Sequence, residues 1–417
     1  MTDTPQQSGK THGKNAFLFV IVTILIDTIG FGLIIPVMPS LIETLMGLGP
    51  EEAVAWGGAL TATYALMNFL AGPTLGSLSD RYGRRVVLLV SIGTLAIDFI
   101  IMGMANSIVL LFIGRALSGI SSATYSTANA YIADVTTPEE RGKAFGMVGA
   151  AFGVGFIIGP AIGGLLGEID PRAPFFAAAG MCTLNFLYGF FVLPESLTEE
   201  NRRDFKWSRA NPMGAMKHFS KLPKIAWFLV AVLIFAFAHA VYPSTWSFHG
   251  EIRYDWTPRE IGISLAVFGV GSAIVQAGLM GIILKRIGAF NTAMLGLSVN
   301  VLAFAGMAMA GFGWIAYALM PLSALGGVAS PAINSIMSNQ TPKDAQGELQ
   351  GASASLQSLA LIFSPLVMTQ ALYHFSKSDA PIHFPGAAFA LASLLAALAI
   401  IPFLMGVRAH REPVPAE

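Results

Sequence analysis

Two acidic side chains lie inside long apolar stretches of this 417-residue chain, at Asp27 and Asp98. A charged group is costly inside a membrane, and such residues usually face a cavity or a partner. Asp27 is followed by two glycines and two prolines, which weaken regular helical hydrogen bonding, at Gly30, Gly32, Pro36 and Pro39. We interpret both acids as proton carriers. The alternative is a structural carboxyl group bonded to a neighbouring helix.

Arg115 is the only basic residue expected inside the membrane. Ser118 and Ser122 follow it at i+3 and i+7, and Asn129 at i+14, so a continuous helix would place them on one face. Because a guanidinium group keeps its proton, Arg115 would act as a fixed charge beside a carboxylate. The alternative is an arginine that packs helices by bonding backbone carbonyls.

Several polar and aromatic side chains in the apolar stretches are candidates for contact with a substrate. His239 has a second interpretation, as a core histidine whose hydrogen bonds are satisfied. The expected substrate-cavity residues are Tyr64, Asn68, Ser118, Ser122, His239, Trp246, Gln276 and Asn300. Phe235 is a further aromatic candidate.

The segment 76–85 concentrates charge between two apolar stretches. A tight hairpin between two membrane-length helices accounts for one acid, three arginines and two glycines in ten residues. We expect a cytoplasmic gate made by Gly76, Asp80, Arg81, Gly83, Arg84 and Arg85. Asp80 would then approach the positive end of a helix that starts after Gly347.

Composition indicates an integral membrane protein. The chain is 54% hydrophobic and 12% charged, whereas a soluble domain carries about 25% charged residues. The net charge of zero argues against a nucleic-acid partner. One cysteine, Cys182, leaves no disulfide framework and no cysteine-based metal site.

Apolar stretches of about 20 residues predict an all-α protein with twelve transmembrane helices in two six-helix bundles. The predicted spans are 16–45, 54–78, 86–104, 108–132, 144–167, 174–193, 224–248, 259–284, 291–310, 313–338, 346–373 and 385–407. Of the 24 Lys and Arg residues, 19 fall on the side that carries both termini, which predicts that both termini are cytoplasmic.

The two halves of the chain repeat each other. An offset of 205 residues aligns Gly76 with Gly281, Gly83 with Gly288 and Pro160 with Pro365. Parallel repeats of this kind are related by an axis normal to the membrane, with substrate sites between them. The predicted organisation is a tail at 1–15, bundles at 16–193 and 224–407, a cytoplasmic linker at 194–223 and a tail at 408–417.

The loop pattern G-x-L-x-D-R-x-G-R-R at 76–85 resembles the signature loop of the major facilitator superfamily. The fifth span carries G-x8-G-x3-G-P-x2-G-G, which resembles the antiporter signature of its drug:proton exporters. Glycines on one face let a neighbouring helix approach closely. The signature residues singled out there are Gly155, Gly159, Pro160, Gly163 and Gly164.

Over residues 16 to 405 the chain resembles the tetracycline-resistance type of twelve-helix antiporter. Supporting stretches include 27–39, 64–70, 130–134, 173–179, 193–196, 261–266 and 346–351. The resemblance implies roles for the residues matching Asp27, Asp80, Asp98, Arg84 and Arg115. It also implies a monomer in the bacterial inner membrane that works by alternating access, driven by the proton gradient without a cofactor.

Three positions differ from the tetracycline exporters. Asn300 stands where they carry an aspartate, Asp255 where they carry a histidine, and Asn68 where glutamine is usual. An asparagine cannot carry a proton, so the C-terminal half lacks one titratable group. We therefore expect a drug:proton antiporter for a lipophilic or amphiphilic small molecule, with tetracyclines one candidate substrate among others.

Three other classes of function are alternatives to an exporter. A proton-coupled symporter for a nutrient or organic anion is the main alternative, and the glycine-proline pattern of the fifth span argues against it. A membrane enzyme would need clustered histidines, cysteines or paired acids, and no two of the seven histidines lie within four residues of each other. A membrane protein without transport would have no need of buried carboxylates.

Overall fold

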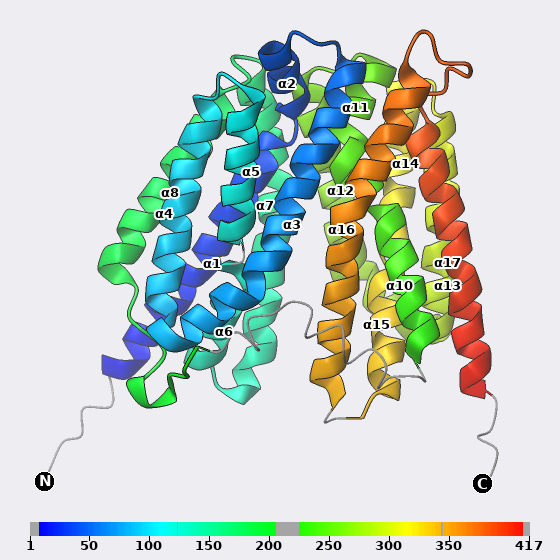
Figure 1. The fold of residues 1–417 in the computed structure, drawn as a ribbon. Helices are drawn as coiled ribbons and strands as arrows, with labels where there is room; N and C mark the ends of the chain where they lie inside the picture. The colour runs from blue at the N-terminus through cyan, green and yellow to red at the C-terminus, as the bar shows by residue number, and fades with distance from the viewer. Residues whose placement is uncertain (1–7, 123, 206–224, 343–344, 412–417) are drawn as a thin grey trace, which may run out of the picture.

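The structure is a computed structural model, which describes all residues except 1–7, 123, 206–224, 343–344 and 412–417. The described residues form helices joined by short connections, with no strand among them. Figure 1 shows two groups of helices side by side. They lie close together at one end and diverge towards the end where α1 begins and α17 ends.

The N-terminal bundle corresponds to the first six predicted spans. Its helices are α1 (Ser8–Ile34), α2 (Met38–Met46), α3 (Pro50–Tyr82), α4 (Arg84–Gly103), α5 (Ile108–Ser122), α6 (Thr124–Val135), α7 (Pro138–Gly167) and α8 (Ala173–Val192). The first predicted span is divided into α1 and α2, because the chain turns at 35–37, beside Pro36. The fourth is described as α5 and α6 on either side of residue 123.

The C-terminal bundle corresponds to the other six spans. Its helices are α10 (Ala226–His239), α11 (Val241–Tyr254), α12 (Pro258–Ile274), α13 (Met280–Met309), α14 (Gly313–Gly326), α15 (Ala329–Gln340), α16 (Gln346–Ser376) and α17 (Ala387–Arg411). A π-helical turn, η4 (Val275–Leu279), joins α12 to α13. Among the described residues, ten helical stretches are long and apolar enough to cross a membrane.

The ten stretches and the twelve predicted spans cover the same helices, but the numbers differ for two reasons. Residues Pro258–Met309 are counted as one stretch of 52 residues. Gly288 interrupts this stretch with a positive φ of 75°, which separates the predicted eighth and ninth spans. The second predicted span, within α3, is not among the ten, although it is one continuous helix that carries charged residues at both ends.

The backbone supports the internal repeat. Gly83, between α3 and α4, has a φ of 101°, and its counterpart Gly288 has a φ of 75°. Left-handed backbone favours glycine because it lacks a Cβ atom. The same special turn therefore occurs at equivalent positions of both bundles.

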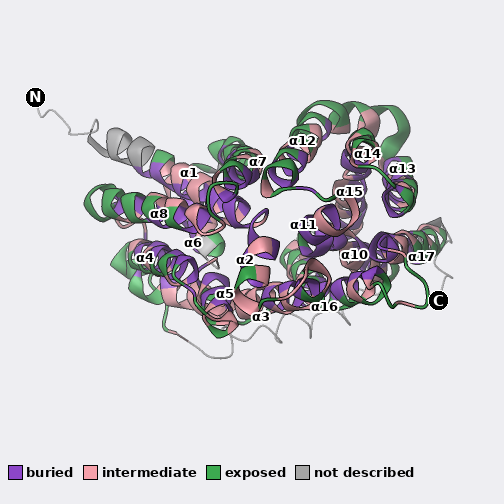
Figure 2. Cartoon of the chain, turned by 90° about the horizontal axis from the view of Figure 1, so that it is seen from above, coloured by how far each residue is buried: buried purple, intermediate pink, exposed green. Residues whose placement is uncertain are grey.

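The outer surface of the bundles is apolar. Large hydrophobic side chains such as Val90, Leu184, Leu302 and Leu394 are each more than 60% exposed. Figure 2 shows the exposed residues gathered on the outward faces of the helices, with the buried ones turned inward. Exposed apolar area on this scale fits contact with lipid.

The predicted linker at 194–223 lies largely outside the described residues. Its described part starts after α8 and includes a short helix, η1 (Glu199–Asn201). This part stays with the N-terminal bundle, because the Arg203 N–H donates to the Asp80 carbonyl at 3.0 Å.

Candidate functional site

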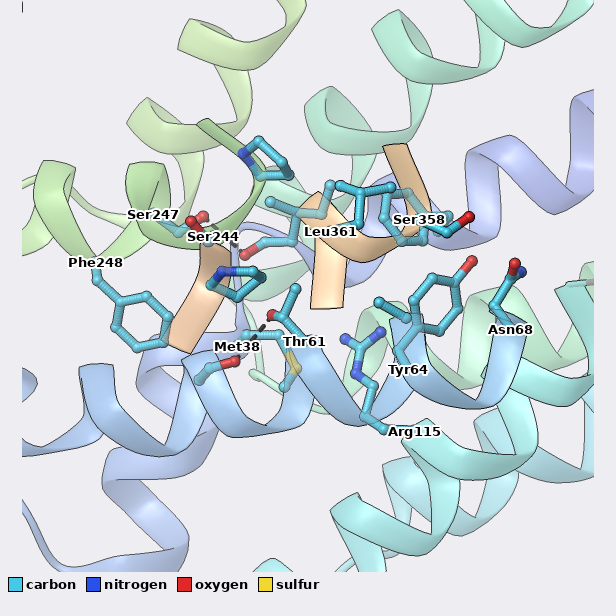
Figure 3. Close-up of a pocket in the computed structure, with 16 residues that line it drawn as sticks. Met38, Thr61, Tyr64, Asn68, Arg115, Ser244, Ser247, Phe248, Ser358 and Leu361 are labelled. Atoms are coloured by element: carbon cyan, nitrogen blue, oxygen red, sulfur yellow. Dashed lines mark hydrogen bonds between the residues drawn. The ribbon is translucent and has the colours of Figure 1, made fainter. Parts of the chain in front are cut away.

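A cavity of about 270 Å³ lies between the two bundles. Its walls come from α1, α2, α3 and α5 on one side and from α11 and α16 on the other. Phe31, Tyr64 and Phe248 contribute aromatic surface, and Arg115 is the one charged residue among the described residues of the lining. Figure 3 shows the Arg115 guanidinium group and the Tyr64 hydroxyl group reaching towards the cavity. We call this the central cavity.

A second cavity of about 400 Å³ lies within the C-terminal bundle. His239, Gln276, Ser323 and Gln357 supply polar groups, and the described part of the chain contributes no acid, lysine or arginine to its lining. Pro243 and Leu361 belong to the linings of both cavities, which makes the two cavities neighbours. Gln276 reaches this cavity from the π-helical turn η4, a local structure that is frequent at functional sites.

Arg115 and Asp98 form the charged part of the N-terminal wall. Asp98, on α4, is fully buried and accepts a hydrogen bond from the Ser118 hydroxyl group on α5. Its other carboxyl oxygen, Oδ1, has no partner among the described residues. Arg115 is 8% exposed, and its Nε likewise has no partner there. Arg115 is thus one turn of α5 away from Ser118, the residue that bonds the buried Asp98 of α4.

Asp27 lies behind the wall of the central cavity. It is one turn of α1 before Phe31, which lines the cavity. Its Oδ1 is buried and unpartnered among the described residues. An unpartnered buried carboxyl oxygen is the group expected of a proton carrier that changes partners during a cycle.

Tyr64 and Asn68 line the central cavity from α3. The Asn68 side-chain amide donates to the Ser122 hydroxyl at 2.5 Å, and that hydroxyl donates to the Gly119 carbonyl at 3.0 Å. Ser118 and Ser122 therefore stand behind the lining, where Ser122 orients the lining residue Asn68 and Ser118 bonds the buried Asp98. His239 lines the second cavity, where its ring packs near Phe235, Tyr242 and Phe304.

Besides Ser118 and Ser122, two more residues expected in the substrate cavity lie outside both linings. The buried Trp246 donates its indole N–H to the Ser264 hydroxyl at 2.8 Å. Asn300 is fully buried, and its amide donates to the Gly296 and Gly326 carbonyls at 2.9 and 2.8 Å. Both side chains hold helices of the C-terminal bundle together, and neither reaches a cavity in this structure.

Sequence reasoning missed most of the wall formed by the C-terminal bundle. Ser244, Ser247 and Phe248 of α11 and Ser358 and Leu361 of α16 line the central cavity. These residues are small hydroxyl or apolar types that occur throughout the chain, so they carried no signal of their own. The internal repeat was the one signal that could have indicated them, because two similar bundles would each form one wall of a cavity between them.

The central cavity is closed at the end remote from the termini by direct contacts between the bundles. The Ser247 hydroxyl on α11 donates to the Ile35 carbonyl at 3.0 Å. Gly57 of α3 lies against the ring of Phe248. Gly58 of α3 lies against Thr369 of α16, whose Cγ2 would be 2.9 Å from any Cβ added to the glycine. We call this region the closed end.

The glycines of α7 form two contacts. Gly155, Gly159 and Gly163 lie on one face and pack on the backbone of α1, where the Ile29 carbonyl oxygen would be 2.7 Å from a Cβ at Gly159. Gly164 faces α12 of the other bundle, with the Pro258 oxygen 2.5 Å from its virtual Cβ. Pro160 lies against Gly32 of α1. The signature of the fifth span thus joins α1 and α12 through one helix.

The charged loop at 76–85 is organised within the N-terminal bundle. The Arg84 side chain donates to Asp80 at 2.5 Å, to Ser79 at 2.7 Å and to Asp134 of α6 at 3.3 Å. The Arg81 guanidinium group lies 5.2 Å from the ring centre of Tyr82. The expected approach of Asp80 to the helix that follows Gly347 is not among its described contacts. Gly76 has open space around it.

Glu195 is a contact residue of this loop that we did not single out from the sequence. Its carboxylate accepts from the backbone N–H groups of Arg84 and Arg85, at 2.8 and 3.2 Å, and of Ser196 and Leu197, at 3.0 and 3.1 Å. Arg84 and Arg85 open α4, so Glu195 satisfies two of its free N–H groups. It also lies directly on Gly83, where a Cβ would collide with it.

The chain matches a known protein family over most of its length. Residues 20–365 match the family model of the Major Facilitator Superfamily. The chain belongs to this superfamily. The resemblance read from the charged loop and the fold class are both confirmed by this match.

Several resistance proteins match the chain over a similar length. The chain is 40% identical to the tetracycline resistance protein, class C, of Escherichia coli over 88% of this chain and 91% of that protein. It is 35% identical to the class B protein of Escherichia coli over 85% and 88% of the two chains. It is 28% identical to multidrug resistance protein 2 of Bacillus subtilis over 84% and 87%.

Solved structures share the fold at low sequence identity. A bacterial homologue of the human lysosomal transporter Spinster, in an inward-facing and unoccupied conformation, superposes with a TM-score of 0.77 at 16% identity. That match covers 98% of this chain and all of the other. The human organic anion transporter MFSD10 superposes with a TM-score of 0.68 at 21% identity, over 94% and 99% of the two chains.

Proposed function

We propose that this protein is a proton-coupled exporter of small amphiphilic drugs, and that tetracyclines are among them. The observation that carries the proposal is the central cavity between the bundles, which has one cation in its wall and two buried carboxyl groups behind it, each with one oxygen that has no partner among the described residues. The relatives named for tetracycline and multidrug resistance support both the class of substrate and the direction of transport.

The chemistry of the cavities fits a flat molecule with one acidic group. Aromatic faces at Phe31, Tyr64 and Phe248 suit ring systems, and Arg115 suits an anionic or strongly polar substituent. The uncharged second cavity, with Gln276 and other neutral polar groups, suits hydroxyl, carbonyl and amide groups. A compact, highly charged nutrient would find no counter-charge beyond Arg115.

The distribution of basic residues supports an orientation with both termini in the cytoplasm. The closed end then faces the periplasm of a bacterial inner membrane, and the two bundles diverge towards the cytoplasm (Figure 1). In this orientation the structure corresponds to the state that takes up a substrate from the inside. Export requires the closed end to open and the cytoplasmic ends to meet.

Proton coupling is assigned to Asp27 and Asp98, with Arg115 as a fixed charge beside Asp98. Inward movement of each positive charge is worth about 2.3 kcal/mol per 100 mV of membrane potential. Both acids lie behind the lining rather than in it, so a substrate would influence them through Arg115 and through Phe31 on the same helix as Asp27. No cofactor or metal enters this scheme.

Inverted membrane vesicles provide the test. Proton-driven uptake of tetracycline and of a panel of other lipophilic drugs would be measured for the unaltered protein and for Asp27→Asn. We expect Asp27→Asn to abolish uptake driven by the proton gradient while drug binding is retained. Asp379→Asn, at an exposed position between α16 and α17, is the control and should leave transport unchanged.

The outcomes separate the parts of the proposal. Gradient-driven transport of other drugs but not of tetracycline would remove tetracycline from the substrates and leave the exporter. Transport by Asp27→Asn equal to that of the unaltered protein would remove Asp27 as proton carrier. Movement of a substrate together with protons would replace the exporter with the symporter.

A further inference from the structure

Two carboxyl groups meet across the bundles at the closed end. Glu43 lies on α2 and Glu251 on the last turn of α11, and their side chains are within hydrogen-bonding contact of each other. Glu43 Oε1 and Glu251 Oε2 are both buried, and neither has a hydrogen-bond donor among the described residues. Two ionised carboxylates repel each other, so this contact requires a proton between them.

The charged groups around this pair make a proton more necessary. Two further acids are close enough to repel the pair. Glu51, at the start of α3, repels an ionised Glu43, and Asp255, directly after α11, repels an ionised Glu251. Arg253 is the basic residue nearest in sequence; its Nε donates to the Ala310 carbonyl at 3.2 Å, and no ion pair between it and either glutamate is among the described contacts. Burial raises the pKa of Glu43 above its ordinary value, and this effect outweighs the hydrogen bond from Glu251, which lowers the pKa; the negative charge of Glu51 adds to the rise.

A metal ion is a poor occupant of this contact. Among the described residues, no group of three or more His, Cys, Asp or Glu side chains is arranged to hold a metal. Because the two carboxyl groups contact each other directly, only a hydrogen atom fits between their oxygen atoms. The pair is therefore distinct in kind from the Arg259–Glu168 ion pair at 3.9 Å, which also joins the bundles at this end.

We propose that Glu43 and Glu251 share one proton, and that this shared proton holds the two bundles together at the closed end. When the proton is present, one carboxyl group donates to the other and the contact stabilises closure. When the proton leaves as the pH rises, the two carboxylates and their acidic neighbours repel each other, and the bundles separate there. Closure is thus favoured at low pH and opposed at high pH.

This contact gives the proposed exporter a second use for a proton. If the closed end faces the periplasm, a proton taken from outside would let the empty transporter close after the substrate has left. That use rests on the proposed function, because it depends on the orientation and on the direction of transport. The proton-dependent contact itself rests only on the two glutamates and their surroundings.

The experiment measures the distance between the bundles without a substrate. Spin labels would be placed at Ile169→Cys and Ile382→Cys, exposed positions of the two bundles near the closed end, in a Cys182→Ala background. Distance distributions would be recorded in lipid nanodiscs from about pH 5 to about pH 9, a range that covers the titration of buried glutamates.

For the unaltered pair we expect the ratio of open to closed molecules to rise with pH. A single shared proton allows at most about a tenfold rise per pH unit. In Glu251→Gln the amide donates to Glu43 without needing a proton. We therefore expect this variant to stay closed across the range, with a rise of less than about twofold per pH unit. Glu43→Gln should behave in the same way.

Glu168→Gln is the matched control, because Glu168 also reaches across the bundles at this end. Its partner is a cation and the pair is exposed, so its removal should leave the pH response unchanged. A pH response of Glu251→Gln and Glu43→Gln equal to that of the unaltered pair would overturn the proposal, as would a distance that does not change with pH. Failure of drug export in vesicles would leave these distances, and hence this proposal, unaffected.

Discussion

Gly164→Ala should open the closed end of the molecule. Gly164 is the point where α7 of the N-terminal bundle meets α12 of the C-terminal bundle. A Cβ atom there would lie 2.5 Å from the Pro258 oxygen, 3.0 Å from the Arg259 Cα and 3.1 Å from the Gly262 Cα. All three are backbone atoms, so no side chain can turn aside to make room.

The size of the effect follows from those distances. Ordinary contacts between carbon atoms are about 3.5–4.0 Å, so α7 and α12 would have to separate by roughly 1 Å. Inserting an extra methyl group into a close-packed contact costs about 1–3 kcal/mol. Because this contact joins the two bundles at the closed end, we expect the cost to fall on the closed state. The ratio of open to closed molecules should then rise about 5- to 150-fold.

The distance measurement with labels at Ile169→Cys and Ile382→Cys tests this prediction. Gly153→Ala is the control on the same helix, since no atom lies within 4 Å of the Cβ it would add. We expect Gly164→Ala to populate longer distances and Gly153→Ala to match the unaltered protein. If both variants gave the unaltered distribution, the α7–α12 contact would not be what keeps this end closed.

Two further substitutions test other contacts. Glu195→Ala should lower thermal stability in detergent by about 1–2 kcal/mol, because two N–H groups that open α4 lose their acceptor. Glu195→Gln should recover part of the loss, and equal melting temperatures for all three proteins would contradict this role. Asn300→Asp should cost about 1–3 kcal/mol, because the amide that donates to the Gly296 and Gly326 carbonyls is replaced by an acceptor. Unchanged stability and a gain in proton-driven transport would instead place Asn300 in the coupling machinery.

The fold was predictable from the sequence because a helix in a membrane must make all the hydrogen bonds of its own backbone. Apolar stretches therefore mark the spans directly, and the charged loop with Gly83 marks a turn between two of them. The breaks within spans were less visible. Gly30, Gly32 and Pro36 predicted irregularity near the end of α1, where the chain does turn before α2. The π-helical turn at 275–279 has no comparable residue signal.

The candidate site was only partly predictable. Charged residues are rare in membrane helices and therefore stand out, whereas neutral polar residues are common there. Arg115 and Tyr64 line the central cavity, and Asp98 lies behind it. Trp246 and Asn300 were chosen for their types, but their hydrogen bonds within the C-terminal bundle occupy them. Residue type alone does not tell a cavity wall from a helix contact in that half.

The closed end combines two kinds of contact that respond differently to pH. The glycine contacts, such as Gly164 against α12, are backbone packing and contain no titratable group. The contact between Glu43 and Glu251 exists only when a proton is present. Packing therefore sets how far the equilibrium favours closure, and the glutamates set how that preference changes with pH. A transporter built in this way can be strongly closed at rest and still open when one proton is lost.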